Sequence, residues 1–600
     1  MMSASKRRVW VGALLLAWLV LWFAGVQSRV LLEPDEGRYA EVPREMVATA
    51  NWVTPRYDGV LFFDKPALQY WGTAIAYEAF GVHNWTARLW ELLTGLMTLV
   101  MVGWAGTRAF GRIAGWGAAG VLGSSLLWII GSHIATLDVG VAAFLGLALC
   151  AFILAQLPDT GPRARRAWML ATWAAMAAAF LSKGLIGIVF PGGALFFYMV
   201  WTRQWALLRR MEWALGLPLF LLLALPWFVA VQLRHGQFLD YFFVRQQFTR
   251  FLTDRDDRQQ PLWFFLPVLV VGFFPWLALL PAALKRPQPQ TGFDARKLLW
   301  IWTLMIFVFF SVSHSKLPLY LLPVFPAVAL LLGDTIARGS NRVLGLALGA
   351  AAAMLLLAVP VALRQHVPAD LALLAPAFRG YMRSLAMAMG VAALMLTTAA
   401  VLGWRERRLA SIGVASFAGL GLLQAALMGF QALAPAYSAA PLARAISPWL
   451  KSGTPIYMVD TLQRGLPFYI RRPVILVGQA PYDLRDGLRW EPWRLMPQQA
   501  FLRRWRHQPG ALAVIAPDAL VALRRQGMPM HQLAHSPRWI LIRRPAANAL
   551  RAMDNRPFTA AQAVVCPPKS KSADPSSTVG ACLHAPQSRR VRTFLTTRGG

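Results

Sequence analysis

The sequence predicts an α-helical polytopic membrane protein with about thirteen transmembrane helices, followed by a small C-terminal extracytoplasmic α/β domain. The 600 residues are 57% hydrophobic and only 14% charged, with a mean hydropathy of +0.46, whereas soluble domains carry about 25% charged residues. Long apolar runs recur as far as residue 433. Beyond that point short apolar segments alternate with polar, Pro- and Gly-bearing connections, as in a small α/β domain.

The apolar runs are long enough to serve as membrane spans. A helix crosses a hydrocarbon core of about 30 Å with roughly 20 mostly apolar residues. Lys6, Arg7 and Arg8 precede the first run as in a signal peptide, but no Ala-x-Ala cleavage site follows, so we expect that run to be retained. The runs are 9–26, 89–109, 113–131, 134–156, 167–181, 185–201, 212–232, 262–284, 298–312, 318–337, 342–363, 383–403 and 408–433.

Basic clusters between the runs predict the orientation. With thirteen spans every cluster falls on one side, which the positive-inside rule makes the cytoplasm. The N-terminus is then cytoplasmic and the C-terminal domain extracytoplasmic. Much of the formal net charge of +33 therefore has a topological explanation, and we expect membrane lipids rather than nucleic acid as partners. The clusters are Lys6/Arg7/Arg8, Arg108/Arg112, Arg163/Arg165/Arg166, Arg203/Arg209/Arg210, Lys285/Arg286/Arg296/Lys297, Arg338/Arg342 and Arg405/Arg407/Arg408.

Three regions follow from these patterns. Residues 1–435 form the transmembrane region, with an amphipathic external loop at 27–88. Residues 436–552 form the α/β domain, and residues 553–600 are expected to be a disordered tail, because they are rich in Ser, Pro, Lys and Arg without periodicity. The strands expected in the domain are 455–460, 466–470, 473–478, 511–516 and 538–542.

The external loop concentrates the acidic residues, since it holds eight of the 27 in the chain. Its first segment predicts an amphipathic helix that lies in the membrane interface, with the apolar face formed by Tyr39, Val42 and Met46. We expect Glu41, Glu45 and Glu78 to be solvated. Asp35, at the start of this helix, either caps it or takes part in chemistry.

Ionisable residues also stand at the outer ends of spans. A charge at the centre of a span costs about 2.5–3.5 kcal/mol, so Asp138 serves either a function or a structural ion pair. Four cations lie on the face that the positive-inside rule leaves poor in them, a pattern suited to an anionic lipid headgroup. For Lys65 between aromatic residues, snorkelling to the interface is the alternative. The four are Lys65, Lys183, Arg250 and Lys316.

Six ordered motifs carry a resemblance to a known family. They are EPDEGRYAE at 33–41, FDKPAL at 63–68, ATLD at 135–138, FLSKG at 180–184, YFFVRQQFTRF at 241–251 and HSKLPLYLLP at 314–323. Over residues 5–435 the chain resembles bacterial lipid-carrier-dependent glycosyltransferases of the GT-C superfamily. Within that superfamily it is similar to 4-amino-4-deoxy-L-arabinose lipid A transferases and to protein O-mannosyltransferases.

The resemblance implies a GT-C fold and a pentosyl- or hexosyltransferase of the bacterial inner membrane, with its C-terminal domain in the periplasm. Such an enzyme moves a sugar from undecaprenyl phosphate to lipid A, or to another glycan or a protein hydroxyl. Asp35 would be the catalytic carboxylate and Asp138 a second acid in the cavity. The substrate-binding residues implied are Glu36, Arg38, Tyr39, Lys65, Lys183, Arg250, Lys316 and Tyr320.

The same resemblance bears on metal use. Relatives usually carry Glu at the position of Asp64, and often a His at the position of Gln247, and these two side chains can hold a divalent metal. Asp64 is therefore the candidate metal ligand of this chain, and a divalent metal is the one cofactor considered.

Other functions compete with this one. A transporter or flippase of lipid-linked sugars would bind a headgroup without chemistry, but it needs polar sites near the membrane midplane, whereas these residues cluster on one face. A binder of nucleic acid or of anionic surfaces through the basic tail is the third class. The role of Asp35 also stays open: it takes a proton from an acceptor hydroxyl, or it positions groups when the acceptor is an ionised phosphate.

Overall fold

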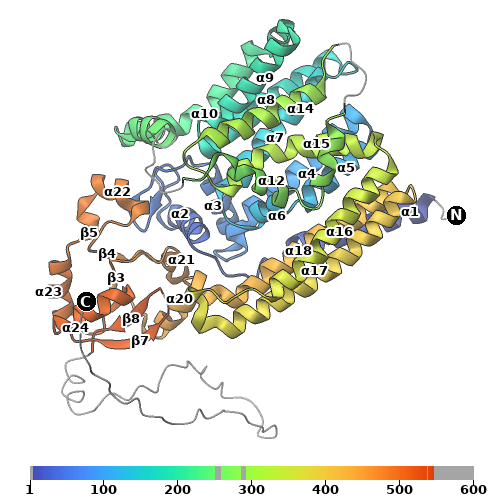
Figure 1. Cartoon of the computed structure of the whole chain (residues 1–600). Coiled ribbons are helices and arrows are strands. Elements are labelled where there is room, and N and C mark those ends of the chain that lie inside the picture. The colour runs from blue at the N-terminus through green and yellow to red at the C-terminus, as the bar shows by residue number, and fades with distance from the viewer. Residues whose placement is uncertain (1–3, 250–258, 286–291, 537, 546–600) are drawn as a thin grey trace, which may run out of the picture. The chain divides into compact units, whose positions relative to one another are not determined.

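A computed structural model describes residues 4–249, 259–285, 292–536 and 538–545. Each of the apolar runs falls on a helix or on two or more consecutive helical segments (Figure 1). The helices of this region are α1 (Ala4–Phe23), α4 (Leu89–Phe110), α5 (Arg112–Ser124), α6 (Leu126–His133), α7 (Leu137–Gln156), α8 (Pro162–Lys183), α9 (Ile186–Thr202), α10 (Trp213–Arg234), α12 (Phe265–Gly272), α13 (Leu280–Ala283), α14 (Ala295–Val312), α15 (Phe325–Arg338), α16 (Asn341–Leu363), α17 (Ala375–Trp404) and α18 (Arg408–Phe430).

The protein is a multi-pass membrane protein. Among the described residues, eight helices are long and apolar enough to cross a membrane, and ten are if each of two bent pairs forms one span. The bends are 61° between α5 and α6 and 105° between Leu262–Gly272 and Leu277–Ala283. The predicted count of about thirteen is higher, because three of the predicted runs fall on helices outside this set: α8, whose first turns carry Arg163, Arg165 and Arg166, and two short helices. The two short apolar helices are Arg8–Phe23 and Ile186–Thr202.

Two central helical segments carry residues of the site described below. Residues 137–156, which form α7, and residues 318–338 are the most buried of the candidate spans, at 83% and 89% of their apolar windows. The second segment starts with the 3₁₀ helix η6 (Pro318–Val324) and continues as α15. Since both are enclosed by protein, side chains at their first turns are held by packing and not by lipid.

The loop between α1 and α4 forms its own small structure. It contains α2 (Asp35–Thr49), the hairpin β1 (Arg56–Tyr57) with β2 (Val60–Leu61), and α3 (Leu68–Phe80). Asp58 and Gly59 connect the two strands with φ angles of 54° and 76°. An Asp-Gly pair with both residues at positive φ is the preferred two-residue hairpin turn.

The C-terminal domain is built on a six-stranded sheet with the order β5-β4-β3-β6-β8-β7. Its first four strands are parallel, and β8 and β7 continue the sheet in antiparallel fashion. The strands are β3 (Ile456–Val459), β4 (Ile475–Val477), β5 (Leu495–Met496), β6 (Leu512–Ile515), β7 (His531–His535) and β8 (Ile540–Arg543). The helices are α19 (Ala434–Tyr437), α20 (Ala440–Ile446), α21 (Leu466–Ile470), α22 (Arg485–Trp490), α23 (Gln498–His507) and α24 (Pro517–Arg525).

Four of the five predicted strands are confirmed. The predicted strand at 466–470 is wrong, because this segment forms α21 with Pro467 in its first turn. A short apolar run fits a buried strand and a buried helix equally well, and proline is favoured at a helix start. The short strands β5 and β7 were not predicted.

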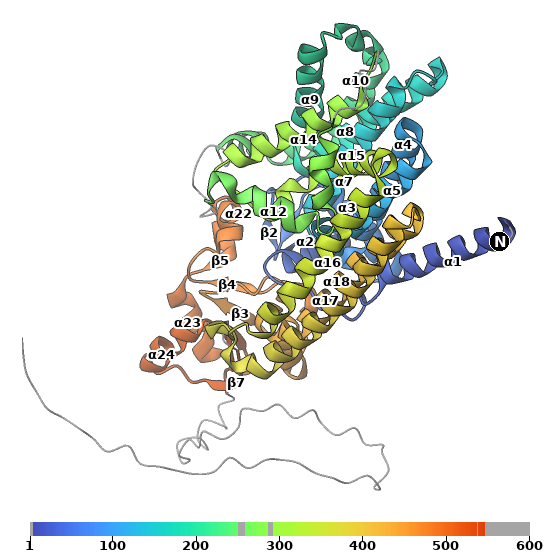
Figure 2. The same ribbon diagram turned by 45° about the vertical axis from the view of Figure 1, so that its right-hand side comes forward.

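The position of α2 corrects a second prediction. Its apolar face does not lie in the membrane interface, because Tyr39, Val42 and Met46 pack in one cluster with Met458 and Val514 of the sheet. The helix therefore lies between the helical region and the domain (Figures 1 and 2). The sequence shows an apolar stripe but not what covers it.

Two acidic residues of α2 that were expected in solvent, Glu41 and Glu45, are consequently buried as well. The Glu41 carboxylate pairs with Arg44 at 2.6 Å, and the Glu45 carboxylate accepts the Gly59 N–H at 3.0 Å. Burial raises the pKa of both carboxyls. The prediction that they are solvated is wrong, while Glu78 is exposed as expected.

The substitution Asp58→Asn should make the protein more stable at alkaline pH. Burial raises the pKa of Asp58 to about 8, although its carboxylate accepts the Val474 N–H. A folded-state pKa above the unfolded value near 4 means that stability falls as pH rises from about 4 to 8. Asn keeps the acceptor for Val474 and tolerates positive φ. At pH 9 the variant should be more stable by at least about 1 kcal/mol, since one pKa unit corresponds to about 1.4 kcal/mol.

Thermal unfolding of wild type and variant at pH 6 and pH 9 measures this effect. The wild-type midpoint should fall more between the two pH values than that of the variant. Equal pH dependence in both proteins would show that Asp58 does not titrate in this range.

Candidate active site

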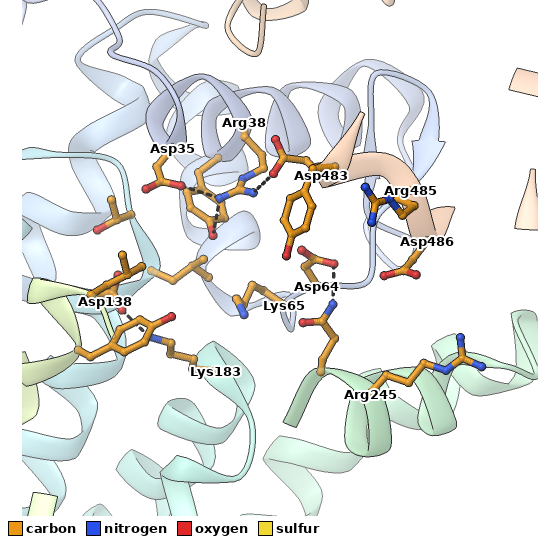
Figure 3. Close-up of a pocket in the computed structure, with 17 residues that line it drawn as sticks. Asp35, Arg38, Asp64, Lys65, Asp138, Lys183, Arg245, Asp483, Arg485 and Asp486 are labelled. Carbon is orange, nitrogen blue, oxygen red and sulfur yellow. Dashed lines mark hydrogen bonds and ion pairs between the residues drawn. The ribbon is translucent and has the colours of Figure 1, made fainter. Parts of the chain in front are cut away.

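A polar cavity is lined by residues from several segments that are far apart in the sequence (Figure 3). These segments are the start of α2, Asp64–Lys65, the start of α7, the end of α8, the η3 segment (Asp240–Thr249), η6 and residues 482–486. It encloses about 960 Å³ of empty space, part of it open to solvent. Its charged lining residues are five acids and five bases: Asp35, Asp64, Asp138, Asp483, Asp486, Arg38, Lys65, Lys183, Arg245 and Arg485.

A chain of ion pairs holds the first predicted carboxylate. Arg38 donates one N–H to Asp35 at 2.6 Å and another to Asp483 at 3.0 Å. Arg464 pairs with the other oxygen of Asp483. Because Arg38 is buried and its guanidinium lies over the Tyr39 ring at 4.7 Å, it is rigidly placed. The Asp35 side chain, in contrast, is 42% exposed and faces the cavity.

The second predicted carboxylate faces the same cavity from α7. Asp138 pairs with Lys183, the last residue of α8. The Lys183 ammonium lies 4.4 Å from the centre of the Tyr320 ring on η6. The sequence left open whether Asp138 has a function or forms a structural ion pair. The structure shows an ion pair, and both of its members line the cavity.

A third polar group surrounds Asp64. Its carboxylate accepts hydrogen bonds from the Tyr241 hydroxyl at 2.7 Å and from the Gln246 amide at 3.2 Å. Burial, and after it the charge of Asp64, raises the pKa of Tyr241 well above its usual value. Burial likewise raises the pKa of Tyr39. Both phenols therefore stay protonated at neutral pH. The Tyr241 hydroxyl donates to Asp64, whereas the Tyr39 hydroxyl accepts an N–H of Arg38 at 3.3 Å.

The metal prediction rests on Asp64 alone. Within the part of the chain that the structure describes, no group of three or more His, Cys, Asp and Glu side chains could hold a metal ion. One oxygen of the Asp64 carboxylate, Oδ1, accepts hydrogen bonds from Tyr241 and Gln246.

The structure thus brings together eight of the predicted residues around the cavity: Asp35, Arg38, Tyr39, Asp64, Lys65, Asp138, Lys183 and Tyr320. Two others lie elsewhere. Glu36 is buried against Arg88, with Nε–Oε1 at 2.6 Å. The buried Lys316 donates to the Ser313 carbonyl at 2.6 Å. Arg250 lies outside the described residues.

The C-terminal domain supplies residues that sequence reasoning missed. Tyr482, Asp483, Arg485 and Asp486 line the cavity from the segment after β4. Parallel strands present their ligand-binding loops at their carboxyl ends. The polar residues just beyond the predicted strand at 473–478 could therefore have been recognised as candidate site residues from the sequence. Gly37 of α2 permits this approach, because a Cβ there would lie 2.5 Å from the Gly465 nitrogen.

Comparisons with known proteins agree with this architecture. The family model of the aminoarabinose transferase C-terminal domain matches residues 442–544, and that of dolichyl-phosphate-mannose-protein mannosyltransferases matches residues 10–242. The crystal structure of ArnT from Cupriavidus metallidurans bound to undecaprenyl phosphate superimposes with a TM-score of 0.84 at 36% identity, covering 91% of this chain and 99% of that one. The undecaprenyl phosphate-alpha-4-amino-4-deoxy-L-arabinose arabinosyl transferase of Pseudomonas aeruginosa is 31% identical over 62% of this chain and 69% of its own length.

The chain belongs to this arabinosyl transferase family. The resemblance read from the six motifs is therefore confirmed, and so is the helical membrane fold with a C-terminal α/β domain. Not every member aligns over its full length. The arabinosyl transferase of Aeromonas salmonicida is 34% identical over 55% of this chain, and the match spans 61% of that protein. For the transferase of Edwardsiella ictaluri the corresponding share is 65%.

Proposed function

We propose that the protein is a glycosyltransferase that moves 4-amino-4-deoxy-L-arabinose from undecaprenyl phosphate to a phosphate of lipid A. The observation that carries the proposal is the cavity itself, in which Asp35 and Asp138 face one space together with Lys65, Lys183 and Tyr320. The similar structure with 36% identity is described as bound to undecaprenyl phosphate, and the relatives are named for transfer of this sugar.

The balance of charge in the cavity fits such a donor. A lipid-linked aminoarabinose carries a negative phosphate and a positive amino group, and the cavity offers five cations and five carboxylates. Opposite charges placed in advance bind a zwitterion without leaving either charge unpaired.

The proposed chemistry assigns a role to the cations and a role to the carboxylates of the cavity. The bond between the anomeric carbon and the donor phosphate oxygen breaks while an acceptor oxygen bonds to that carbon, so undecaprenyl phosphate leaves as the anion. Lys65 and Lys183 stabilise the charge that collects on it, with Tyr320 beside Lys183 and Arg250 as a further candidate. Asp35 stabilises the positive charge that develops on the sugar, and it accepts a proton when the acceptor is a hydroxyl. Asp138 orients Lys183.

The cavity also bears on the competing transporter function. Asp138 is the second residue of α7, Lys183 the last of α8, and Tyr320 belongs to the first turn of η6. The polar groups therefore lie at one end of these spans, whereas transporters bind their cargo near the midplane. This placement favours chemistry at the membrane surface.

We further propose that the N-terminus is cytoplasmic and that the C-terminal domain and the cavity face the periplasm of the bacterial inner membrane. The support is the positive-inside rule. The end of α8 that lies away from the cavity carries the cluster Arg163, Arg165 and Arg166.

A transfer assay tests the proposed function. Purified protein in vesicles receives undecaprenyl phosphate-linked aminoarabinose and lipid A, and mass spectrometry measures lipid A. We expect a mass increase of one aminoarabinose residue that depends on both substrates. Movement of the intact donor across the vesicle membrane without any modified lipid A would favour a transporter and contradict the proposal.

A further inference from the structure

The C-terminal domain presents an arginine to the cavity whose charge is not used by the fold. Arg485 is the first residue of α22, is exposed and lines the cavity beside Tyr482. Within the part of the chain that the structure describes, no carboxylate forms an ion pair with Arg485. Its guanidinium lies 5.6 Å from the centre of the Tyr482 ring, a distance at which a cation is attracted to an aromatic face. A guanidinium held in this way keeps its N–H groups for an anion.

The acidic neighbours of Arg485 have other partners. Asp483 pairs with Arg38 at 3.0 Å. Asp486 pairs with Arg489 at 3.1 Å. Both acids lie within two residues of Arg485, yet each is held by a different arginine. The positive charge of Arg485 is therefore not neutralised by the carboxylates of its own segment.

Packing fixes the backbone that carries Arg485. Leu488 of α22 is 4% exposed, and a Cβ at Gly487 would lie 2.1 Å from the Leu61 carbonyl oxygen of the hairpin in the external loop. The Glu491 carboxylate accepts the Leu61 N–H at 3.1 Å. Since the helix is held at both its apolar face and its end, binding of an anion orders only the side chain of Arg485, and this keeps the entropic cost low.

A second arginine reaches the same cavity from the helical region. Arg245 of η3 lines the cavity with a side chain that is 48% exposed, and its distance of 3.8 Å to Asp240 is that of a weak, exposed ion pair. Figure 3 shows Arg245 and Arg485 on one side of the cavity and the Asp138–Lys183 pair on the other. The cavity thus has two separate groups of cations.

Two groups of cations suit the proposed transfer, because it brings two phosphates to one carbon. The donor phosphate leaves the anomeric carbon while an oxygen of the acceptor phosphate bonds to it. Like charges repel at this separation unless each has its own counter-charges. Lys65 and Lys183 serve the donor phosphate in the proposed mechanism, so the acceptor phosphate needs other cations. Asp64 does not oppose it, since this carboxylate already accepts two hydrogen bonds.

We propose that Arg485, together with Arg245, binds the phosphate of the acceptor. This inference rests on the proposed function and adds to it the place where the acceptor is held. Arginine suits this role because its planar fork donates two parallel N–H bonds to a phosphate. The C-terminal domain is then part of the substrate-binding site and recognises the group that receives the sugar.

The variants Arg485→Gln, Arg245→Gln and Arg485→Lys test the assignment. The matched control is Arg525→Gln, since Arg525 is an exposed residue at the end of α24 that is not among the residues lining the cavity. It removes the same charge from the same domain, and so reports any general attraction to an anionic lipid. The measurements on the full-length protein are the Kd for lipid A, for dephosphorylated lipid A and for undecaprenyl phosphate, and the KM for donor and for acceptor.

We expect Arg485→Gln to raise the Kd for lipid A and the acceptor KM by about tenfold, as for a lost hydrogen bond between charged groups. Arg245→Gln should act in the same direction, and Arg485→Lys should lose less, because it keeps the charge without the fork. Wild type and Arg485→Gln should bind dephosphorylated lipid A equally. The Kd for undecaprenyl phosphate should not change, and Arg525→Gln should behave as wild type.

An unchanged lipid A Kd in Arg485→Gln, beside a wild type that binds and transfers, would overturn the inference and leave the proposed function standing. A rise confined to the Kd for undecaprenyl phosphate and the donor KM would also overturn it, since the arginine would then serve the donor. If the wild type transferred no sugar but Arg485→Gln still removed phosphate-dependent binding of lipid A, the proposed function would fail and the phosphate site would remain. Should Arg485→Gln fail to fold, Arg245→Gln carries the same comparison.

Discussion

The substitution Asp35→Asn should lower sugar transfer by about 100-fold or more, within the range that a catalytic acid or base contributes. Asp35 is half-exposed, faces the cavity and lies on the cavity side of the Arg38–Asp483 chain of ion pairs. Asparagine keeps the shape and an acceptor for Arg38 but removes the negative charge. It therefore removes both a base and the charge that stabilises a positive sugar.

The measurement is kcat for transfer to lipid A, beside the Kd for undecaprenyl phosphate. We expect kcat to fall while the Kd changes little, because the phosphate is bound by the cationic residues. Asp518→Asn on the exposed first turn of α24 serves as the control and should be as active as wild type. Transfer by Asp35→Asn at the wild-type rate would remove Asp35 from the mechanism.

The substitution Glu36→Ala should destabilise the protein by about 3–5 kcal/mol, as expected when one partner of a buried ion pair is removed. Glu36 and Arg88 have side chains that are each 1% exposed. The carboxylate also accepts the backbone N–H groups of Leu32 and Ala135, at 2.8 and 3.0 Å. Alanine would leave a buried guanidinium and two backbone donors without their partner.

This residue also connects the segments that carry Asp35 and Asp138, the two carboxylates of the proposed mechanism. Glu36 follows Asp35 directly, and the Ala135 nitrogen that it holds lies three residues before Asp138. We therefore expect Glu36→Ala to lower kcat even at temperatures where the protein stays folded, because the two carboxylates lose their common support.

Thermal unfolding followed by tryptophan fluorescence measures the stability loss. The control is Asp159→Ala, which removes the ion pair with Arg108. This pair is exposed: the side chain of Asp159 is 68% exposed and that of Arg108 is 49% exposed. An exposed pair contributes at most about 1 kcal/mol, so this variant should unfold as wild type does. If Glu36→Ala unfolded at the same temperature as Asp159→Ala, the connecting role would be refuted.

The sequence alone reached much of the candidate site because its ionisable residues stand out against an apolar background. Asp35, Lys65, Asp138 and Lys183 were found at the outer ends of spans or in the adjacent loop, and the structure places all four around one cavity. Ordered motifs added Arg38, Tyr39 and Tyr320. The cost of a charge near the membrane makes each such residue informative before any fold is known.

Three residues show where this reasoning stopped. Glu36 belongs to the same motif as Asp35, but adjacent residues on a helix point in different directions, and only the fold shows that Glu36 meets Arg88. Asp483 and Arg485 are unremarkable in a soluble segment, where charged residues are common. They reach the cavity because the sheet packs on α2, a contact between residues more than 400 positions apart.

The sequence by itself determined the membrane class, the helical runs, four strands of the domain and the principal carboxylates and cations, because hydropathy and charge act locally along the chain. The tertiary structure alone decided which helices bend, that α2 is buried beneath the sheet, and that the domain completes the cavity. These features depend on which surfaces meet, and packing between distant segments leaves no period or composition in the sequence from which it could be read.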